Sequence, residues 1–445
     1  MKRRDFLKNI FGAGVAAGFP TIVPAAVLGR GGAVAPSERI NLAAVGLGTQ
    51  GTSNMQNFFG DRRVQVVGLC DVNNTEGRQY YGYSNNTTYG LRAARKLFGS
   101  DIPCYNDYRQ MLAELDIDAI CSSLPDHWHA VSGIDYVKAG KDVYGEKPLT
   151  RTIREGRVLR DVVQSSGCIW QTGSWQRSLP QFVRAVEIVR SGVLGEIRRI
   201  EITVPGNFVG EVLAPEPVPQ GFDYELWQGP ALHSSFYNPR RTFTRWRGVS
   251  NYSAGKIADW GAHHLDIALW ATDAGKKGFV EAVPEYVEWQ KDGFSDQPVR
   301  FRVSLFYDNL EIAIMDMTSD RRFASDSGVM FYGSKGKKLF ISRETFYSQP
   351  LDIISKRIAP ADERAFPIRN GNHFTAFIDS VIDRRIATTD IGEAHRTNTG
   401  CLLAEIAYRL NRPIKWDADR EEIVGDPLAA RMCDRVYTAP WQLRA

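Results

Sequence analysis

A glycine-rich segment joins an apolar run to a helical pattern near the start of this chain, and it narrows the choice of fold at once. Residues 46 to 51 read GLGTQG and follow the run INLAAV. Gly46 permits a sharp turn, Gly48 lets the backbone approach a pyrophosphate, and Gly51 lets the following helix pack closely. The N-terminus of that helix would face the negative charge. The segment therefore predicts a dinucleotide-binding turn after the first strand of a parallel sheet.

A carboxylate ends the second apolar run of the chain. Asp71 closes the run VQVVGLCD and follows Gly51 by 20 residues, the spacing expected for a carboxylate that binds both ribose hydroxyls of the adenosine. Such a carboxylate would repel a 2′-phosphate, which favours NAD over NADP. The alternative is a glycine turn in an ordinary strand-to-helix joint, with Asp71 as a helix cap.

Strand-like runs alternate with helical patterns through the first third of the chain. The expected strands lie at 40–46, 64–71, 119–125 and 142–148, and the expected helices at 49–59, 91–98 and 129–139. This alternation predicts an α/β fold, with a doubly wound parallel sheet (a Rossmann domain) over residues 37 to 170. The stretch from 73 to 90, rich in Asn and Tyr, is expected to be a loop inserted after the second strand.

The pattern changes after residue 170. A helical pattern at 179–191 leads into IRRIEITVPG, and strand-like runs follow at 299–307, 310–318 and 337–342. Helical patterns return at 374–383 and 393–410. We expect residues 171 to 445 to form a substrate-binding α/β domain with an open, largely antiparallel sheet. The two domains should share an interface with a cleft between them.

The first 36 residues are typical of an export signal and linker. Arg3 and Arg4 precede an apolar, charge-free run from 9 to 29, the layout of a twin-arginine leader that directs a protein to the periplasm. A basic amphipathic anchor or a retained membrane span is the alternative. The whole chain carries a net charge of +4, and all of this excess lies in residues 1 to 30. The rest of the chain therefore has no net charge, which argues against nucleic acid or an anionic membrane as a partner.

Cysteine usage argues against a disulfide scaffold and against a Cys-based metal site. The chain has 6 Cys, and no pair has CxxC or CxxxC spacing. We therefore expect buried free thiols. A metal site at His263, His264 and Asp266 is disfavoured, because adjacent histidines on a helix diverge. No metal is expected.

Two segments carry residues suited to acid–base chemistry. Lys147 stands at a strand end, where a partly buried lysine can share a proton near neutrality. Residues 258 to 271 are expected to form one helix with Asp259 and His263 on the same face. An Asp one turn before a His can fix its tautomer and raise its basicity. Asp266 and Trp270 share that face and are expected to pack or cap.

Four motifs together resemble the Gfo/Idh/MocA oxidoreductases: GLGTQG, PDHWH at 125–129, EKP at 146–148 and DWGAHHLD at 259–266. The resemblance covers residues 38 to 445 and implies a Rossmann domain joined to an open-sheet α/β domain, a nicotinamide cofactor, and a sugar or cyclitol substrate. It also implies that Lys147, Asp259 and His263 form the catalytic group. His263 would then accept the proton, with Lys147 and Asp259 polarising and orienting.

Further positions are expected to line the cofactor and the substrate. The expected cofactor contacts are Gly46, Gly48, Thr49, Gln50, Gly51, Asp71, Pro125, Asp126, His129, Glu146, Lys147, Gln176, Arg177 and Trp227. Candidate substrate contacts are Trp175, residues 243 to 247 and Tyr252. Aromatic faces and guanidinium groups suit the flat face and the hydroxyls of a sugar. Packing at the domain interface is the alternative for each.

Three functions compete at this point. The first is an NAD(H)-dependent oxidoreductase acting on a hydroxyl of a sugar, cyclitol or glycoside. The second is a redox-neutral glycosidase or epimerase, such as the family 109 glycoside hydrolases that the resembling family includes. The third is a non-catalytic sugar-binding protein, which the presence of Lys147, Asp259 and His263 argues against. An exported enzyme must retain its NAD through many turnovers, and a homo-oligomer is expected.

Overall fold

The computed structural model describes residues 34–75, 89–276, 278–318, 326–357 and 371–444. Within these ranges, the residues from 40 onward form one compact unit. Almost all of the expected leader lies outside the described residues, as does most of the expected insertion at 73–90. Within the described ranges, no helix has both the length and the apolar character that crossing a bilayer requires.

The N-terminal part of this unit is built on a parallel sheet, as predicted. Its order is β3-β2-β1-β4-β5-β6, and every neighbouring pair runs parallel. The strands are β1 Ile40–Val45, β2 Val64–Cys70, β3 Cys104–Tyr105, β4 Ala119–Ser122, β5 Asp142–Gly145 and β6 Trp170–Thr172. All of β1 is buried, as expected for a strand that is covered on both faces.

Helices connect these strands. They are α2 Thr49–Phe59, α3 Leu91–Phe98, α4 Tyr108–Glu114, α5 His129–Lys138 and α6 Ile153–Ser166. The start of α6 is fixed by a capping box, in which the Thr152 side chain and the Glu155 side chain each accept a hydrogen bond from the other residue's backbone amide. The predicted helices at 49–59 and 91–98 match α2 and α3, and the one at 129–139 ends one residue earlier.

The C-terminal part is built on a mixed sheet that is mostly antiparallel, which confirms the predicted fold class. Its order is β13-β12-β11-β7-β10-β9-β8-β14-β15; β7 and β10 pair in parallel, and the other neighbours pair antiparallel. The strands are β7 Arg199–Val204, β8 Phe279–Trp289, β9 Pro298–Tyr307, β10 Leu310–Asp316, β11 Gly328–Tyr332, β12 Lys338–Ser342, β13 Phe346–Gln349, β14 Ile414–Asp417 and β15 Glu422–Val424.

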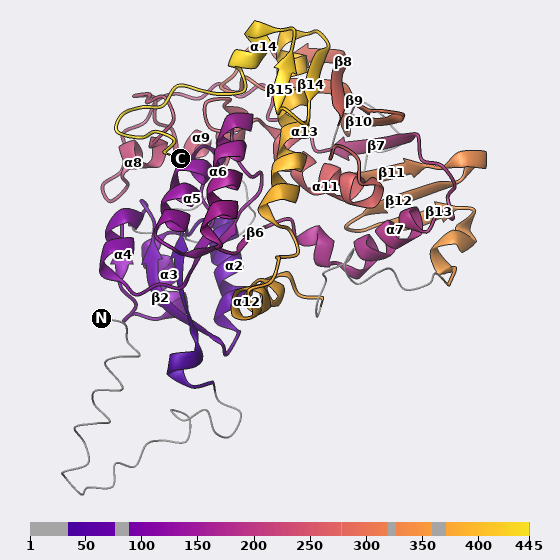
Figure 1. Ribbon diagram of the computed structural model, residues 1–445. Helices are drawn as coiled ribbons and strands as arrows, with labels where there is room; N and C mark the ends of the chain where they lie inside the picture. The colour runs from indigo at the N-terminus through magenta and orange to yellow at the C-terminus, as the bar shows by residue number, and fades with distance from the viewer. Residues whose placement is uncertain (1–33, 76–88, 277, 319–325, 358–370, 445) are drawn as a thin grey trace, which may run out of the picture. The chain divides into compact units, whose positions relative to one another are not determined.

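The C-terminal part contains eight α-helices within the described ranges. They are α7 Pro180–Arg190, α8 Tyr224–Gln228, α9 Pro239–Phe243, α10 Lys256–Asp259, α11 Gly261–Thr272, α12 His373–Asp383, α13 Ile391–Leu410 and α14 Pro427–Arg431. Apolar side chains of α7, α11 and α13 pack with the sheet in one buried cluster. α13 also contacts α6 of the N-terminal part, and Figure 1 shows it running between the two sheets.

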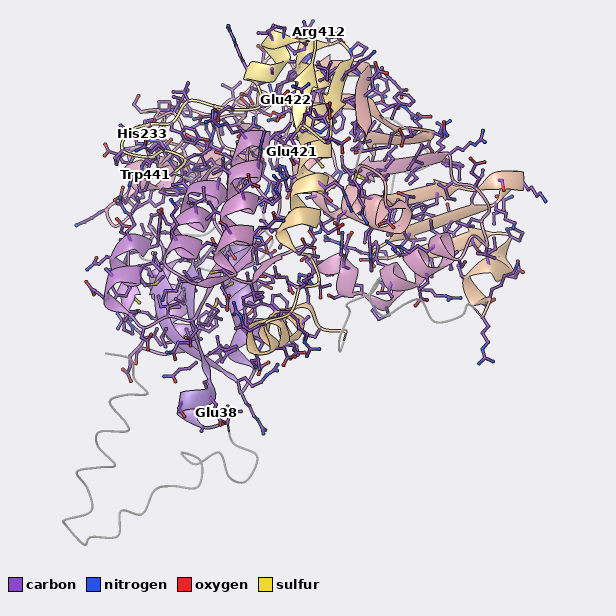
Figure 2. All side chains as sticks on the ribbon, in the orientation of Figure 1. Glu38, His233, Arg412, Glu421, Glu422 and Trp441 are labelled. Atoms are coloured by element: carbon purple, nitrogen blue, oxygen red, sulfur yellow. The ribbon has the colours of Figure 1, made fainter. Side chains whose placement is uncertain are left out.

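Two segments of the C-terminal part return to the N-terminal sheet. Phe374 and Phe377 of α12 pack edge-on against Phe58 of α2. The tail carries Trp441 back to the N-terminal half (Figure 2), where its ring lies 4.7 Å from that of Trp128. The division at 170 and 171 remains a sequence-based prediction, and these contacts cross it. All six cysteines are free, and Cys70, Cys121 and Cys401 are buried.

Candidate functional site

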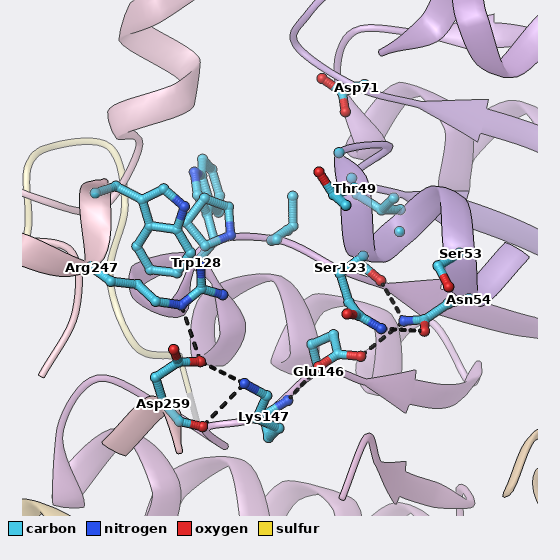
Figure 3. A pocket seen from close by; sticks show the side chains of 18 of the residues that line it. Thr49, Ser53, Asn54, Asp71, Ser123, Trp128, Glu146, Lys147, Arg247 and Asp259 are labelled. Carbon is cyan, nitrogen blue, oxygen red and sulfur yellow. Dashed lines mark hydrogen bonds and ion pairs between the residues drawn. The ribbon is translucent and has the colours of Figure 1, made fainter. Parts of the chain in front are cut away.

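A cavity of about 700 Å³ opens at the carboxyl ends of β1, β2, β4 and β5. In a parallel α/β sheet this edge is where ligands bind. The C-terminal part closes the other side with α10, α11 and the loops around Trp175 and Arg343. Figure 3 shows Asp71 and Thr49 at one end of the cavity and Lys147, Asp259 and Arg247 at the other.

The glycine turn has the geometry that its sequence predicted. Gly46 has a φ of +85°, and a Cβ there would lie 2.5 Å from the carbonyl oxygen of Ser123. A Cβ at Gly51 would collide with the carbonyl oxygen of Gly46. Gly48 is the N-cap residue just before α2, and no side chain caps the first turn of that helix. The turn thus leaves backbone amides directed at the cavity, a cradle suited to a pyrophosphate.

Asp71 stands beside this turn with both carboxylate oxygens engaged by backbone. Leu47 N donates to one oxygen at 2.6 Å and Asn73 N donates to the other at 2.7 Å. Burial raises the pKa of Asp71 to about 6, although the two backbone hydrogen bonds act in the opposite direction. Each oxygen keeps a lone pair for a further donor. Together with the glycine cradle, this carboxylate fits the adenosine and pyrophosphate of NAD.

Glu146 supports the middle of the cavity and is buried. Its carboxylate accepts a hydrogen bond from Asn54 Nδ2 at 2.9 Å, and Asn54 also donates to Ser123 Oγ at 3.1 Å. The second Glu146 oxygen accepts from the backbone amide of Lys147 at 3.2 Å (Figure 3). These bonds tie α2, β4 and β5 together and fix the backbone from which Lys147 projects.

Lys147 and Asp259 meet at the far end of the cavity, although 112 residues separate them. Lys147 Nζ lies 2.6 Å from Asp259 Oδ1 and 3.1 Å from the Asp259 carbonyl oxygen. Two more cations reach the same carboxylate: Lys256 Nζ at 2.9 Å and Arg247 Nε at 3.2 Å. Burial alone would raise the pKa of Asp259, but the three cations hold it well below its ordinary value. Asp259 is therefore ionised and anchors Lys147.

His263 lines the same end of the cavity, but its surroundings differ from the prediction. The expected single helix at 258–271 is interrupted at Trp260, which separates α10 from α11. The Asp259 carboxylate is committed to its three cations, and His263 Nδ1 is buried without a hydrogen-bond partner. Asp259 thus does not fix the tautomer of His263. Burial, with the charges of Lys147 and Arg343, lowers the pKa of His263 well below its ordinary value, so the ring is neutral at pH 7.

Most of the predicted cofactor contacts lie in the cavity wall, but four do not: Asp126, His129, Gln176 and Arg177. Asp126 is buried and accepts a hydrogen bond from Ser253 Oγ at 2.7 Å. Both ring nitrogens of His129 lie within hydrogen-bond distance of backbone carbonyl oxygens: Nε2 is 2.8 Å from that of Leu124, and Nδ1 is 2.7 Å from that of Pro148. These side chains fasten the backbone that borders the cavity.

Arg177 and Gln176 lie behind the cavity rather than on it. Arg177 is buried and pairs through two nitrogens with Asp266, at 2.6 and 2.7 Å, so the expectation that Asp266 packs agrees with the structure. The Gln176 side-chain amide is oriented so that both its nitrogen and its oxygen have partners. The nitrogen donates to the His263 carbonyl at 3.2 Å, and the oxygen accepts from Arg343 Nε at 3.1 Å. Both residues precede α7 and follow β6, and that turn points them into the protein.

Several side chains of the wall were missed from the sequence, and two of them are the cations Arg343 and Lys256. Arg343 follows β12, and the sequence around it, ISRET, carries no motif. Its place depends on how the large sheet is assembled. Lys256 lies three residues before Asp259, and this spacing on a helix is a signal that was available. Of the candidate substrate contacts, Trp175 and every residue of 243–247 except Arg245 line the cavity, whereas Tyr252 is buried behind it.

Comparison with known proteins agrees with the two-part fold. The description "Oxidoreductase family, NAD-binding Rossmann fold" matches residues 40–174, and "Oxidoreductase family, C-terminal alpha/beta domain" matches residues 184–443. The chain belongs to the Gfo/Idh/MocA family of NAD-dependent oxidoreductases. NAD is the cofactor that the matched Rossmann domain binds.

Individual relatives of this Gfo/Idh/MocA protein are distant. A glycosyl hydrolase family 109 protein of a Shewanella species is 27% identical over 170 residues, which is 37% of this chain and 35% of that one. The chain spans about a third to just over a half of the length of the curated relatives it matches.

Two solved structures share the fold. The aldose-aldose oxidoreductase of Caulobacter crescentus has a TM-score of 0.60 at 15% identity, with 85% of this chain and 99% of that one covered. The myo-inositol 2-dehydrogenase of Lactobacillus plantarum has a TM-score of 0.56 at 16% identity, with 84% and 98% covered.

Proposed function

We propose that this protein oxidises or reduces a hydroxyl carbon of a sugar, cyclitol or glycoside with NAD(H) that it retains between turnovers. One observation carries the proposal: a single cavity joins the glycine cradle and Asp71 to the Lys147–Asp259 pair beside His263. The aromatic and guanidinium groups near Lys147 and Asp259 suit the flat face and the hydroxyls of a sugar.

Each residue of the chemistry end has a distinct part in this proposal. When bound, NAD⁺ supplies the acceptor for a hydride. Neutral His263 takes the hydroxyl proton, and the Lys147 ammonium stabilises the oxygen as it becomes negative. Asp259 holds Lys147 in place through the bond at 2.6 Å. The alcohol becomes a carbonyl, the two electrons leave as hydride, and the proton passes from His263 to water.

The proposal is tested on protein purified with whatever nicotinamide it retains. Acid-released nucleotide is identified and quantified, and the protein is then mixed with a panel of sugars, cyclitols and glycosides while reduced nicotinamide is followed by fluorescence. We expect bound NAD and reduction by at least one class of compound. Nucleotide-loaded protein whose redox state no compound changes would refute the proposal.

Net glycoside cleavage is the second candidate, and the names of several relatives as glycosyl hydrolase family 109 proteins favour it. In that reaction a hydroxyl is oxidised, the aglycone is eliminated, water adds to the resulting double bond, and the hydride returns to the same sugar. Aryl glycosides distinguish the two candidates. Release of the phenol without net reduction of NAD supports cleavage, and accumulation of NADH with no phenol supports the dehydrogenase.

We also propose that the leader exports the folded protein, on the evidence of Arg3, Arg4 and the apolar run that follows. Export would explain why the nicotinamide must stay bound, since free cofactor is scarce outside the cytoplasm. Cell fractionation of the native chain and of an Arg3→Lys, Arg4→Lys double variant is the test. We expect the native chain in the periplasm and the variant in the cytoplasm, and equal cytoplasmic retention of both would contradict export.

A further inference from the structure

Positive charge exceeds negative charge at the chemistry end of the cavity. Lys147, Arg247 and Lys256 share one carboxylate, that of Asp259. A fourth cation, Arg343, lines the same wall. Glu146 also lines the cavity, and the charge of the buried Asp126 carboxylate acts on Arg247. Four cations thus face three carboxylates, and a further negative charge that binds among the cations would be favourable.

Arg343 is held in place without a carboxylate of its own. Its guanidinium carbon lies 4.5 Å from the ring centroid of Trp175 and 4.5 Å from that of Trp260. The Gln176 amide oxygen accepts from Nε at 3.1 Å. No ion pair links Arg343 to an acidic side chain within the described ranges. A guanidinium fixed by two indoles and one amide keeps its remaining N–H groups for another acceptor.

The same two indoles place Arg343 beside the proposed proton acceptor. The His263 ring lies 6.2 Å from that of Trp175 and 6.4 Å from that of Trp260, in edge-on contact with each. The charge of Arg343 also contributes to lowering the pKa of His263. A group bound by Arg343 and a carbon that reacts next to His263 therefore fit within one small molecule.

We infer that the substrate is an anionic sugar, whose carboxylate or phosphate is bound by Arg343 while a ring hydroxyl reaches His263 and Lys147. The inference rests on the proposed function and names its substrate class. A guanidinium recognises either oxyanion through paired N–H···O bonds. The pyrophosphate of the cofactor does not account for these cations, because its cradle lies with Gly46 and Gly51 at the other end of the cavity.

Matched triplets of sugars test the inference on the NAD-loaded protein. Each triplet contains a neutral hexose, its uronate and its 6-phosphate, in the gluco, galacto and manno series. Binding is followed by calorimetry and by the fluorescence of the tryptophans that flank Arg343, and turnover by NAD reduction. We expect at least one uronate or phosphate to bind about 10-fold or more tighter than its neutral counterpart. Tight binding of the uronate identifies a carboxylate as the recognised anion, and tight binding of the 6-phosphate identifies a phosphate.

Variants at one position separate recognition from support of the fold. Arg343→Gln should weaken binding of the preferred anion about 10- to 150-fold and leave weak binding of the neutral hexose unchanged, whereas Arg343→Lys should keep part of the preference. Arg420→Gln, at an exposed arginine near β15, is the matched control and should change neither. NAD content and melting temperature verify that each variant is folded.

The outcomes distinguish this inference from the proposed function. Equal affinity for neutral and anionic sugars, no binding by any member of the triplets, or equal loss for all sugars in Arg343→Gln would overturn the inference. Neutral sugars that reduce NAD in such a case would leave the oxidoreductase function intact. Conversely, tight binding of a uronate that never changes the redox state of NAD would support the anion site and contradict the function.

Discussion

The two ends of the cavity are built from different parts of the chain. The residues that hold Asp71 come from the glycine turn and from the end of the next strand. The residues around Lys147 come from segments spread between β5 and the turn after β12. Backbone amides set the first end, and they hold Asp71 through Leu47 and Asn73. Side-chain charges set the second, where three cations share Asp259. A site made by local backbone tolerates change in the rest of the chain, but one made by distant side chains depends on the packing of both sheets.

The largest expected difference between the two ends is in hydride transfer. His263→Ala removes the proposed proton acceptor and should slow single-turnover reduction of bound NAD by an active sugar about 100- to 10,000-fold. Lys147→Ala should be at least as damaging, because it removes the charge beside the developing alkoxide. NAD affinity, measured on the same samples, should change little, since the cradle and Asp71 remain.

Lys415→Ala, at an exposed lysine of β14, is the matched control and should leave both quantities unchanged. Asp259→Asn should also slow the reaction while preserving NAD binding, because Lys147 loses the carboxylate that holds it. Unchanged hydride transfer in His263→Ala and Lys147→Ala would place the chemistry elsewhere. Loss of NAD affinity alone would show that these residues serve the cofactor end.

A substitution at Arg177, which lies behind the cavity, tests whether this residue supports the fold or contacts the cofactor. It is bound through two nitrogens to Asp266, and their side chains are only 5% and 4% exposed. Removing one partner of such a pair leaves a buried charge, so Arg177→Ala should lower the free energy of unfolding by about 3–5 kcal/mol. Chemical denaturation measures this. Adding Asp266→Ala should recover part of the loss, and unchanged stability with weakened NAD binding would restore Arg177 as a cofactor contact.

The local parts of the molecule were predictable and the long-range parts were not. Gly46, Gly51 and Asp71 follow a spacing that is set within one strand–helix–strand unit, so sequence alone located them. Helix α3 was predicted at its observed bounds for the same reason. α6 was left out, although Thr152 and Glu155 carry a capping signature. Such signals describe neighbours along the chain.

Arg343 and the break at Trp260 show where this reasoning ends. Arg343 reaches the cavity because β12 takes its place in the large sheet, and no pattern near it records that register. The helical pattern at 258–271 was correct in type, but it did not reveal the break at Trp260 between α10 and α11. Gln176 and Arg177 follow a strand end, as cavity residues often do, yet the turn after β6 directs both into the interior.

At the Asp71 end, a substitution should change which cofactor binds rather than the rate of the chemistry. Asp71→Ala removes a carboxylate that would accept from the ribose hydroxyls, so NAD affinity should fall about 10- to 150-fold. NADP affinity should fall less or rise, because the negative charge that repels its 2′-phosphate is gone. Equilibrium binding of both cofactors to apo protein tests this. Tighter binding of NADP than of NAD by the unmutated protein would contradict the role of Asp71.

The smallest expected effect is a pH dependence confined to the same end. The pKa of Asp71 is raised to about 6 from 3.8. Between about pH 4 and 6 the folded apo protein therefore binds more protons at this residue than the unfolded chain, so this residue's contribution to stability falls as pH rises. NAD affinity should change in the opposite direction, rising up to roughly tenfold from pH 5 to pH 7, because the ionised carboxylate is the better acceptor for ribose hydroxyls.

Asp71→Asn isolates this titration, since it keeps the size of the side chain and an oxygen for one of the two backbone amides and removes the ionisation. Its NAD affinity should be nearly flat over the same range, and its apo stability should lose the Asp71 component of the pH dependence. The difference between wild type and variant cancels the titration of every other group. An equal pH dependence of NAD affinity in both proteins would mean that the charge of Asp71 plays no part in binding, and that the backbone cradle alone distinguishes this end of the cavity from the other.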